Sequence, residues 1–163
     1  MENIKNEAVT NELTAQENAQ HEMSVQEQFG NAKQEVFTSI VDDGTLERKA
    51  IVFNAMNDTD YALRDYVGKV IEITDFVAHK ITLEDERTGE ITNATRCVFI
   101  DKDGKTYGTV SSGINQSMVK LFGTVGFPAT WDNPLPIKVM EKTGRKGFRF
   151  LTIGLALEPT KAK

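Results

Sequence analysis

The chain has 163 residues, enough for one domain with its own hydrophobic core, and its formal net charge is -5. Residues 1–30 contain six glutamates and one lysine and so carry 1 - 6 = -5 by themselves, which leaves the rest of the chain neutral and does not exclude a polyanionic partner. A single cysteine, Cys97, excludes an internal disulfide framework or a cysteine-rich zinc site, and no apolar run is long enough for a membrane span.

The N-terminal segment, residues 1–32, is rich in Glu, Gln and Asn and has few large apolar side chains. Such a segment cannot bury enough surface to offset the entropy lost on ordering, so we predict a disordered acidic tail. The alternative is a weak helix that docks on a partner. Because no basic start followed by an apolar run marks a signal peptide, the expected location is the cytoplasm of a bacterial or infected host cell.

Residues 33–66 predict a small strand-and-helix extension. Residues 48–56 (RKAIVFNAM) have the composition of a strand, and residues 57–59 can cap a short helix over residues 60–66 that ends before Gly68. The extension is expected to pack on the domain that follows, because four of its apolar or aromatic side chains need cover: Ile51, Phe53, Leu63 and Tyr66.

Residues 67–158 show the pattern of a small β-barrel. The predicted strands and helix are, in chain order, strands at 69–83, 91–100 and 105–111, a short amphipathic helix at 115–122, and strands at 136–142 and 148–157. Three meander strands, a helix and a hairpin form the element order of a five-stranded OB barrel. We therefore predict a mainly β fold, an OB-fold barrel with one helix between strands three and four, followed by a short C-terminal tail at 159–163.

Several short stretches carry a resemblance to a known family: Asn54-Ala55, Ala62-Leu63, Tyr66-Val67-Gly68-Lys69, and a glycine-containing helix before a basic hairpin. They resemble the single-stranded DNA-binding proteins of phages and conjugative elements of Gram-positive bacteria. The resemblance implies an OB fold, sequence-tolerant binding of single strands, and a role in replication or transfer of mobile DNA. Many bacterial proteins of this functional class have an acidic C-terminal tail. Here the acidic segment is N-terminal and the chain ends in Lys161-Ala162-Lys163, so tail-mediated recruitment of partner enzymes is not implied.

Side-chain alternation along each strand predicts which residues face the core. Core parity is assigned to Leu151, Ile153, Leu155 and Leu157, and likewise to Ile71, Ile73, Val98, Ile100 and Val110. Bases stack on exposed rings, and the opposite parity predicts outward aromatic residues: Phe76, Phe99, Tyr107, Phe148 and Phe150. The alternative is that a bulge or the extension buries these rings. Trp131, in the loop at 127–136, either clamps a base or plugs the barrel end.

The positions of the basic residues predict where a DNA strand would bind. Lys142, Arg145, Lys146 and Arg149 surround the tip of the last hairpin beside Phe148, at one of the two loops that line an OB cleft. The alternative is a solvated turn whose cations only favour solubility. The other cleft loop, residues 84–90, is acidic and would repel phosphates. A strand is therefore expected to pass closer to three other cations, Lys80, Arg96 and Lys105.

The sequence shows no pattern typical of catalysis or metal binding. The two histidines, His21 and His79, are far apart, no nucleophile is paired with a base, and residues 101–104 (DKDG) fit a hairpin turn better than a calcium loop. We expect no cofactor, no metal and no enzymatic activity. The leading hypothesis is a single-stranded DNA-binding protein that coats and protects strands during replication or transfer of a mobile element and that can form homo-oligomers along the strand. The alternatives are an OB-type protein-binding adaptor or structural protein of a phage or plasmid, and an RNA or oligosaccharide ligand.

Overall fold

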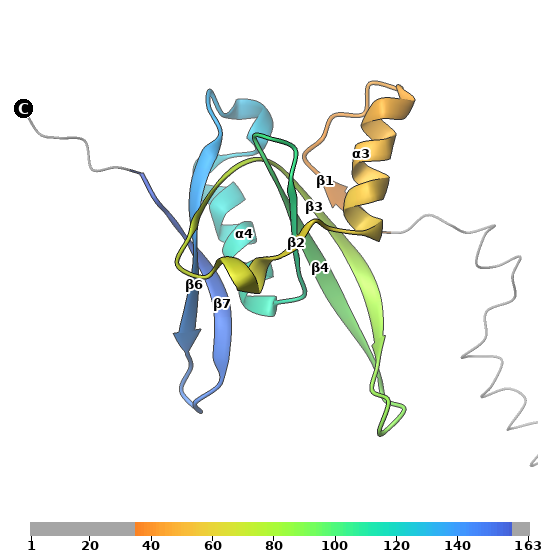
Figure 1. Cartoon of the computed structure of the whole chain (residues 1–163), viewed down its shortest axis with the longest axis vertical. Helices are drawn as coiled ribbons and strands as arrows, with labels where there is room; N and C mark the ends of the chain where they lie inside the picture. The colour runs from red at the N-terminus through yellow and green to blue at the C-terminus, as the bar shows by residue number, and fades with distance from the viewer. Residues whose placement is uncertain (1–34, 158–163) are drawn as a thin grey trace, which may run out of the picture. The chain divides into compact units, whose positions relative to one another are not determined.

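The structure is a computed structural model that describes residues 35–157. The predicted acidic tail at 1–32, with His21, and the C-terminal tail at 159–163 lie outside the described residues. The described residues form one curved sheet with two α-helices and two 3-10 turns (Figure 1). In this part of the chain no helix is long and apolar enough to cross a membrane. The fold is therefore mainly β, as predicted from the sequence, and consistent with an OB-like architecture.

The sheet is built from a meander of three strands and a hairpin, and the long first strand of the meander pairs with the hairpin. Its elements are β1 (Val36–Thr38), β2 (Tyr61–Ala62), β3 (Val70–Glu84), β4 (Ile91–Asp101), β5 (Thr106–Thr109), β6 (Leu135–Thr143) and β7 (Arg149–Leu155). Strand order is β2-β5-β4-β3-β6-β7, with β1 paired to β3. The strands predicted for residues 67–158 correspond to β3 to β7, while β1 and β2 join from the extension. Within residues 35–157 the pairing runs from β2 to β7 without closing, so the sheet is curled rather than a closed five-stranded barrel.

Helix α3 (Leu46–Asn57) stands where a strand was expected at residues 48–56. The β-branched run in this stretch favours a strand locally, but Val52, Ala55 and Met56 have helical spacing and pack against the sheet. Thr45 caps the helix, because its hydroxyl accepts a hydrogen bond from the Arg48 amide at 3.4 Å. The strand prediction is therefore wrong, since tertiary packing overrides the local propensity. The short helix expected at 60–66 is a 3-10 turn, η1 (Leu63–Tyr66), preceded by β2.

Over the part of the β3–β4 ribbon away from its turn, both faces are buried. One face carries the main core together with α4 (Ser112–Val125), and Phe99, Ile114 and Ile137 are completely buried there. On the other face α3 covers a second cluster that includes Val77, Val98 and Ile100. The extension covers this face of the sheet through α3 and makes it a second core, but two of the side chains expected to need cover, Ile51 and Phe53, are exposed.

A bulge in β3 changes the parity of its side chains. Ile73 lies opposite Asp101, whereas Asp75 lies opposite Ile100, so the register shifts by one residue between them. One extra residue moves every later side chain to the other face. Phe76 is consequently buried in the main core with Ile73, and the prediction that it faces outward is wrong.

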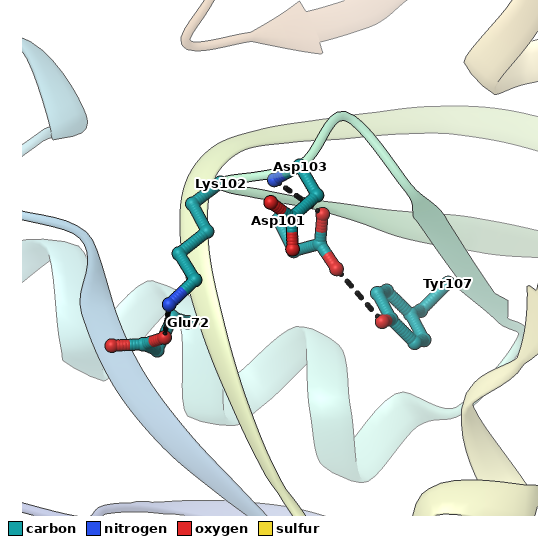
Figure 2. A network of polar contacts seen from close by, with 5 residues as sticks. All are labelled: Glu72, Asp101, Lys102, Asp103 and Tyr107. Atoms are coloured by element: carbon teal, nitrogen blue, oxygen red, sulfur yellow. Dashed lines mark hydrogen bonds and ion pairs between the residues drawn. The ribbon is translucent and has the colours of Figure 1, made fainter.

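The β4–β5 turn is held by the carboxylate of Asp101 (Figure 2). One oxygen accepts hydrogen bonds from the backbone amides of Asp103 and Lys105, both at 2.9 Å, and the other accepts the hydroxyl of Tyr107 at 2.8 Å. Beside the turn Lys102 forms an ion pair with Glu72 of β3. These contacts confirm the predicted hairpin turn and direct the Tyr107 ring into the core.

Two arms extend from the sheet to the same side (Figure 1). The first is the end of the β3–β4 ribbon, whose exposed turn at residues 84–90 is the predicted acidic loop. The second is the β6–β7 hairpin, whose turn lies at residues 144–148. Helix α4 is seen between the two arms. This arrangement places an acidic tip and a basic tip at the ends of separate arms.

Candidate nucleic-acid interface

The tip of the β6–β7 arm presents an exposed ring among cations. We call residues 142–149 the cationic hairpin. Its turn is tight, because the Gly144 amide donates to the Phe148 carbonyl at 2.8 Å, and Gly147 has a φ of 78°, which favours glycine. Phe148 is 73% exposed, and Phe150 is also exposed. An apolar ring held in solvent beside positive charge suits a nucleic acid, which offers both bases and phosphates.

The cations of the hairpin are free to meet phosphates. Arg149 forms an ion pair with Glu141 at 3.4 Å, but its side chain is largely exposed, and such surface pairs contribute only about 0–1 kcal/mol. Among the described residues the other three cations, Lys142, Arg145 and Lys146, have no carboxylate partner. A phosphate chain could therefore bind here without breaking a strong interaction.

A second aromatic group lies where η1 meets β5, and sequence reasoning did not single it out. The rings of Tyr61, Tyr66 and Tyr107, which we call the tyrosine cluster, have centroid distances of 4.8 to 5.3 Å. The amines of Lys69 and Lys105 lie 5.0 Å and 5.9 Å from the Tyr66 and Tyr61 centroids. The cluster depends on parallel pairing of β2 with β5, which places Tyr61 opposite Tyr107. The sequence singled out Tyr107 and Lys105 separately and Tyr66 only within a family-like stretch, and no local pattern brings the three rings together.

Within the tyrosine cluster the three rings have different roles. Tyr61 and Tyr66 are partly exposed, whereas Tyr107 is only 6% exposed and forms the base of the cluster. Burial and the hydrogen bond to Asp101 raise the pKa of the Tyr107 phenol, so its hydroxyl stays protonated. Proximity of Lys105 to Tyr61 raises the pKa of the lysine, which keeps the amine cationic. The surface part of the cluster thus offers two rings and two positive charges.

Three rings predicted to face outward are buried, so that orientation is wrong for Phe76, Phe99 and Tyr107. For Phe76 the cause is the bulge. For Phe99 the cause is α3, because it covers the face of Val98 and Ile100, and the main core therefore lies on the Phe99 side. Core parity assigned to Val110, Leu155 and Leu157 also fails, since these side chains are exposed. In this structure the three buried rings offer no free face to a base.

The remaining predicted residues are dispersed. Lys80 is exposed and pairs with Glu35 at 2.5 Å. Arg96 is partly buried on the opposite face of the ribbon, where its guanidinium donates to the Thr59 hydroxyl at 3.1 Å. Trp131 packs on the main core, and its indole donates to the Gly126 carbonyl at 3.1 Å, so it serves as a plug rather than an open clamp. The structure thus gathers the hairpin residues and separates Lys80 from Arg96.

Arg96 also influences a buried histidine. His79 lies opposite Arg96 in the β3–β4 register, and among the described atoms its Nε2 has no hydrogen-bond partner. Burial and the nearby guanidinium lower the pKa of His79, which favours the neutral imidazole. This pair is a feature of the ribbon interior and not of the exposed interface.

Comparison with known protein families identifies the molecule. A family model described as phage single-stranded DNA-binding protein matches residues 8–156. The chain belongs to this family. The match confirms the resemblance inferred from the sequence and the role in binding single-stranded DNA during phage replication. Neither the curated proteins nor the solved structures that were compared gave a match.

Proposed function

We propose that the cationic hairpin and the exposed part of the tyrosine cluster form the surface on which this phage protein binds single-stranded DNA. The four hairpin cations would contact phosphates, while Phe148, Tyr61 and Tyr66 would stack on bases. Stacking contributes about 1–3 kcal/mol per base and has little sequence preference, because every base has a π-face. This arrangement supports sequence-tolerant binding without any catalytic step.

The observation that carries the proposal is the environment of Phe148. Phe148 is 73% exposed at the end of an arm, and Lys146 and Arg149 lie on either side of it in the sequence. Burial in the core cannot explain this ring, and a plain soluble turn would gain nothing from it. Stacking on a base beside a phosphate would use the ring and its neighbours together.

Coating and protection of strands follow from the same chemistry. A protein that holds bases against its rings and phosphates against its cations shields both from other molecules. We further propose that successive molecules bind along one strand, so that any homo-oligomer is arranged by the DNA. Within this proposal the curled sheet acts as an OB-like barrel whose arms border the binding surface. RNA remains an alternative ligand, because the hairpin offers no evident contact that distinguishes the 2′-hydroxyl.

Binding measurements across a salt series test the proposal. The wild type should bind single strands more tightly than duplexes, and its affinity should fall as salt rises. Replacing Arg145, Lys146 and Arg149 by Ala should weaken binding and reduce the salt slope by about 0.7 for each lost phosphate contact. The matched control removes three exposed cations elsewhere, Arg48 and Lys49 on α3 and Lys120 on α4. Equal losses in the two triple variants would show that the hairpin contributes only net charge.

A further inference from the structure

A separate groove lies between β1 and α4, and its walls are mainly apolar. It encloses about 720 Å³, and its lining includes Phe37, Phe122 and Phe127. Their ring centroids are 5.2 to 5.9 Å apart, and Phe37 and Phe127 are 42% and 52% exposed. We call this the phenylalanine groove. Its volume is in the range of ordinary ligand pockets, and a group of exposed apolar rings is typical of a binding surface.

The phenylalanine groove continues toward the proposed DNA surface. Lys80, Thr95 and Asn115 line both this groove and a neighbouring hollow of about 470 Å³, which reaches Val110 and Ser112 at the start of α4. This hollow ends at the first turn of α4. Figure 1 shows α4 between the two arms.

On the far side of that turn the surface meets β7. Gly113 packs so closely on β7 that an added Cβ would lie 2.3 Å from the Leu151 carbonyl oxygen and 3.2 Å from the Phe150 ring. Phe150 in turn lines a small hollow together with Arg149 of the cationic hairpin. Neighbouring residues therefore link the phenylalanine groove, by way of the N-terminal turn of α4, to the base of the hairpin.

We infer that the phenylalanine groove binds bases of the same DNA strand that contacts the cationic hairpin, as a second and mainly apolar subsite. This inference rests on the proposed function of the hairpin. The rings supply stacking surfaces, and the amide of Asn115 and the hydroxyl of Thr95 supply hydrogen bonds for base edges. Lys80 lies where the groove meets the neighbouring hollow. It can leave its ion pair with Glu35 to bind a phosphate, because both side chains are mostly exposed.

The two subsites have different physical signatures. Hairpin binding depends on phosphate contacts and therefore on salt, whereas stacking in the phenylalanine groove is nearly independent of salt. A groove variant should lower affinity without changing the salt slope, and a hairpin variant should lower both. Because these linking residues separate the two subsites, the groove should matter most for strands long enough to reach both.

The experiment uses the full chain with oligothymidylates of about 6 and about 16 nucleotides, the range of site sizes known for OB folds. Phe127→Ala should reduce affinity for the long strand by about five- to 150-fold, the equivalent of one lost stack, with a smaller loss for the short strand and an unchanged salt slope. Leu46→Ala, which removes a highly exposed apolar side chain on α3, is the control and should bind as the wild type does. Melting temperatures confirm that the variants are folded.

A second groove variant and a fluorescence signal test the same subsite without removing a ring. Val119→Asp places a carboxylate at an exposed position on the groove wall and should weaken long-strand binding without removing a ring. Trp131, the only tryptophan, donates its hydrogen bond to Gly126, the neighbour of Phe127, so its emission should change when a long strand binds.

The possible results separate the two proposals. Wild-type affinity for the long strand in both groove variants, with the hairpin triple variant impaired, would overturn the inference and leave the groove to a protein partner. A normal salt slope in the hairpin triple variant would instead overturn the proposed function.

Discussion

Tyr107 and Phe148 are both aromatic residues of the predicted binding set, yet their environments are opposite. Tyr107 is buried and its hydroxyl satisfies Asp101, whereas Phe148 stands in solvent. Cys97 is also completely buried. Desolvation raises the pKa of its thiol to about 12, so the thiol stays neutral and unreactive. Burial therefore decides whether a residue of this protein serves stability or binding.

Substituting the two rings should separate these roles. Tyr107→Ala should lower the free energy of unfolding by about 3–5 kcal/mol, as other large-to-small core changes do. Phe148→Ala should leave it nearly unchanged and weaken single-strand binding by about 1–3 kcal/mol. Urea denaturation and a DNA titration measure the two quantities. Tyr107→Phe serves as the control, because it removes only the bond to Asp101. A stable Tyr107→Ala protein with impaired binding would show that this ring acts at the surface.

At the scale of elements, the position of α4 depends on the absence of side chains at one point of contact. Gly113, in the first turn of α4, allows the helix to approach the backbone of β7 at Leu151. A hydrogen bond between Ser117 and Thr152, at 2.9 Å, joins the same two elements. Gly123 lies nearly three turns further on, and no atom lies within 4 Å of the place where its Cβ would be. The helix therefore requires glycine at position 113, whereas position 123 has room for a side chain.

These glycines form a matched pair of mutations. Gly113→Ala should destabilise the protein by about 1–3 kcal/mol, because the new methyl group overlaps a backbone carbonyl that cannot easily move. Gly123→Ala should stabilise it by about 0.5–1 kcal/mol, since alanine is the better helix former. Thermal unfolding of both variants checks the sign. If Gly113→Ala were as stable as Gly123→Ala, α4 would not be held closely against β7.

For the molecule as a whole, charge is distributed unevenly along the chain. All of the net charge of -5 comes from residues 1–30, and from Lys102 onward ten basic residues face four acidic ones. The family match begins at residue 8, so it includes most of the acidic segment. Like charges repel over about 10 Å at 0.1 M salt and over longer distances at lower salt. The acidic segment should therefore oppose binding of a phosphate chain most strongly at low ionic strength.

Deletion of residues 1–30 should raise affinity for single strands at low salt and leave the melting temperature nearly unchanged, because the segment has few side chains that could pack. Titrations at low and high salt measure the effect. A full-length variant with the six glutamates replaced by Gln separates charge from length and should behave as the deletion does. Unchanged affinity at low salt would identify a plain solubilising extension, and lost binding would indicate that the segment helps molecules assemble along the strand.

What the sequence alone determined is mostly local. The strands β3 to β7, the turn at Asp101 and the exposed cationic hairpin follow from alternation, turn residues and composition, all of which act over a few neighbouring residues. The family resemblance had the same basis, in short stretches and in the order of elements. These features were predictable because the forces that specify them do not depend on distant parts of the chain.

Only the tertiary structure decided which side of each strand is interior. A bulge after Ile73 reversed the parity of β3, and packing made a helix of residues 46–57, which then buried the face of Val98. The tyrosine cluster and the phenylalanine groove likewise join residues that are far apart in the chain, such as Phe37 and Phe122. Side-chain periodicity specifies that a strand has two faces, but the surface each face meets depends on long-range packing, which no local pattern contains.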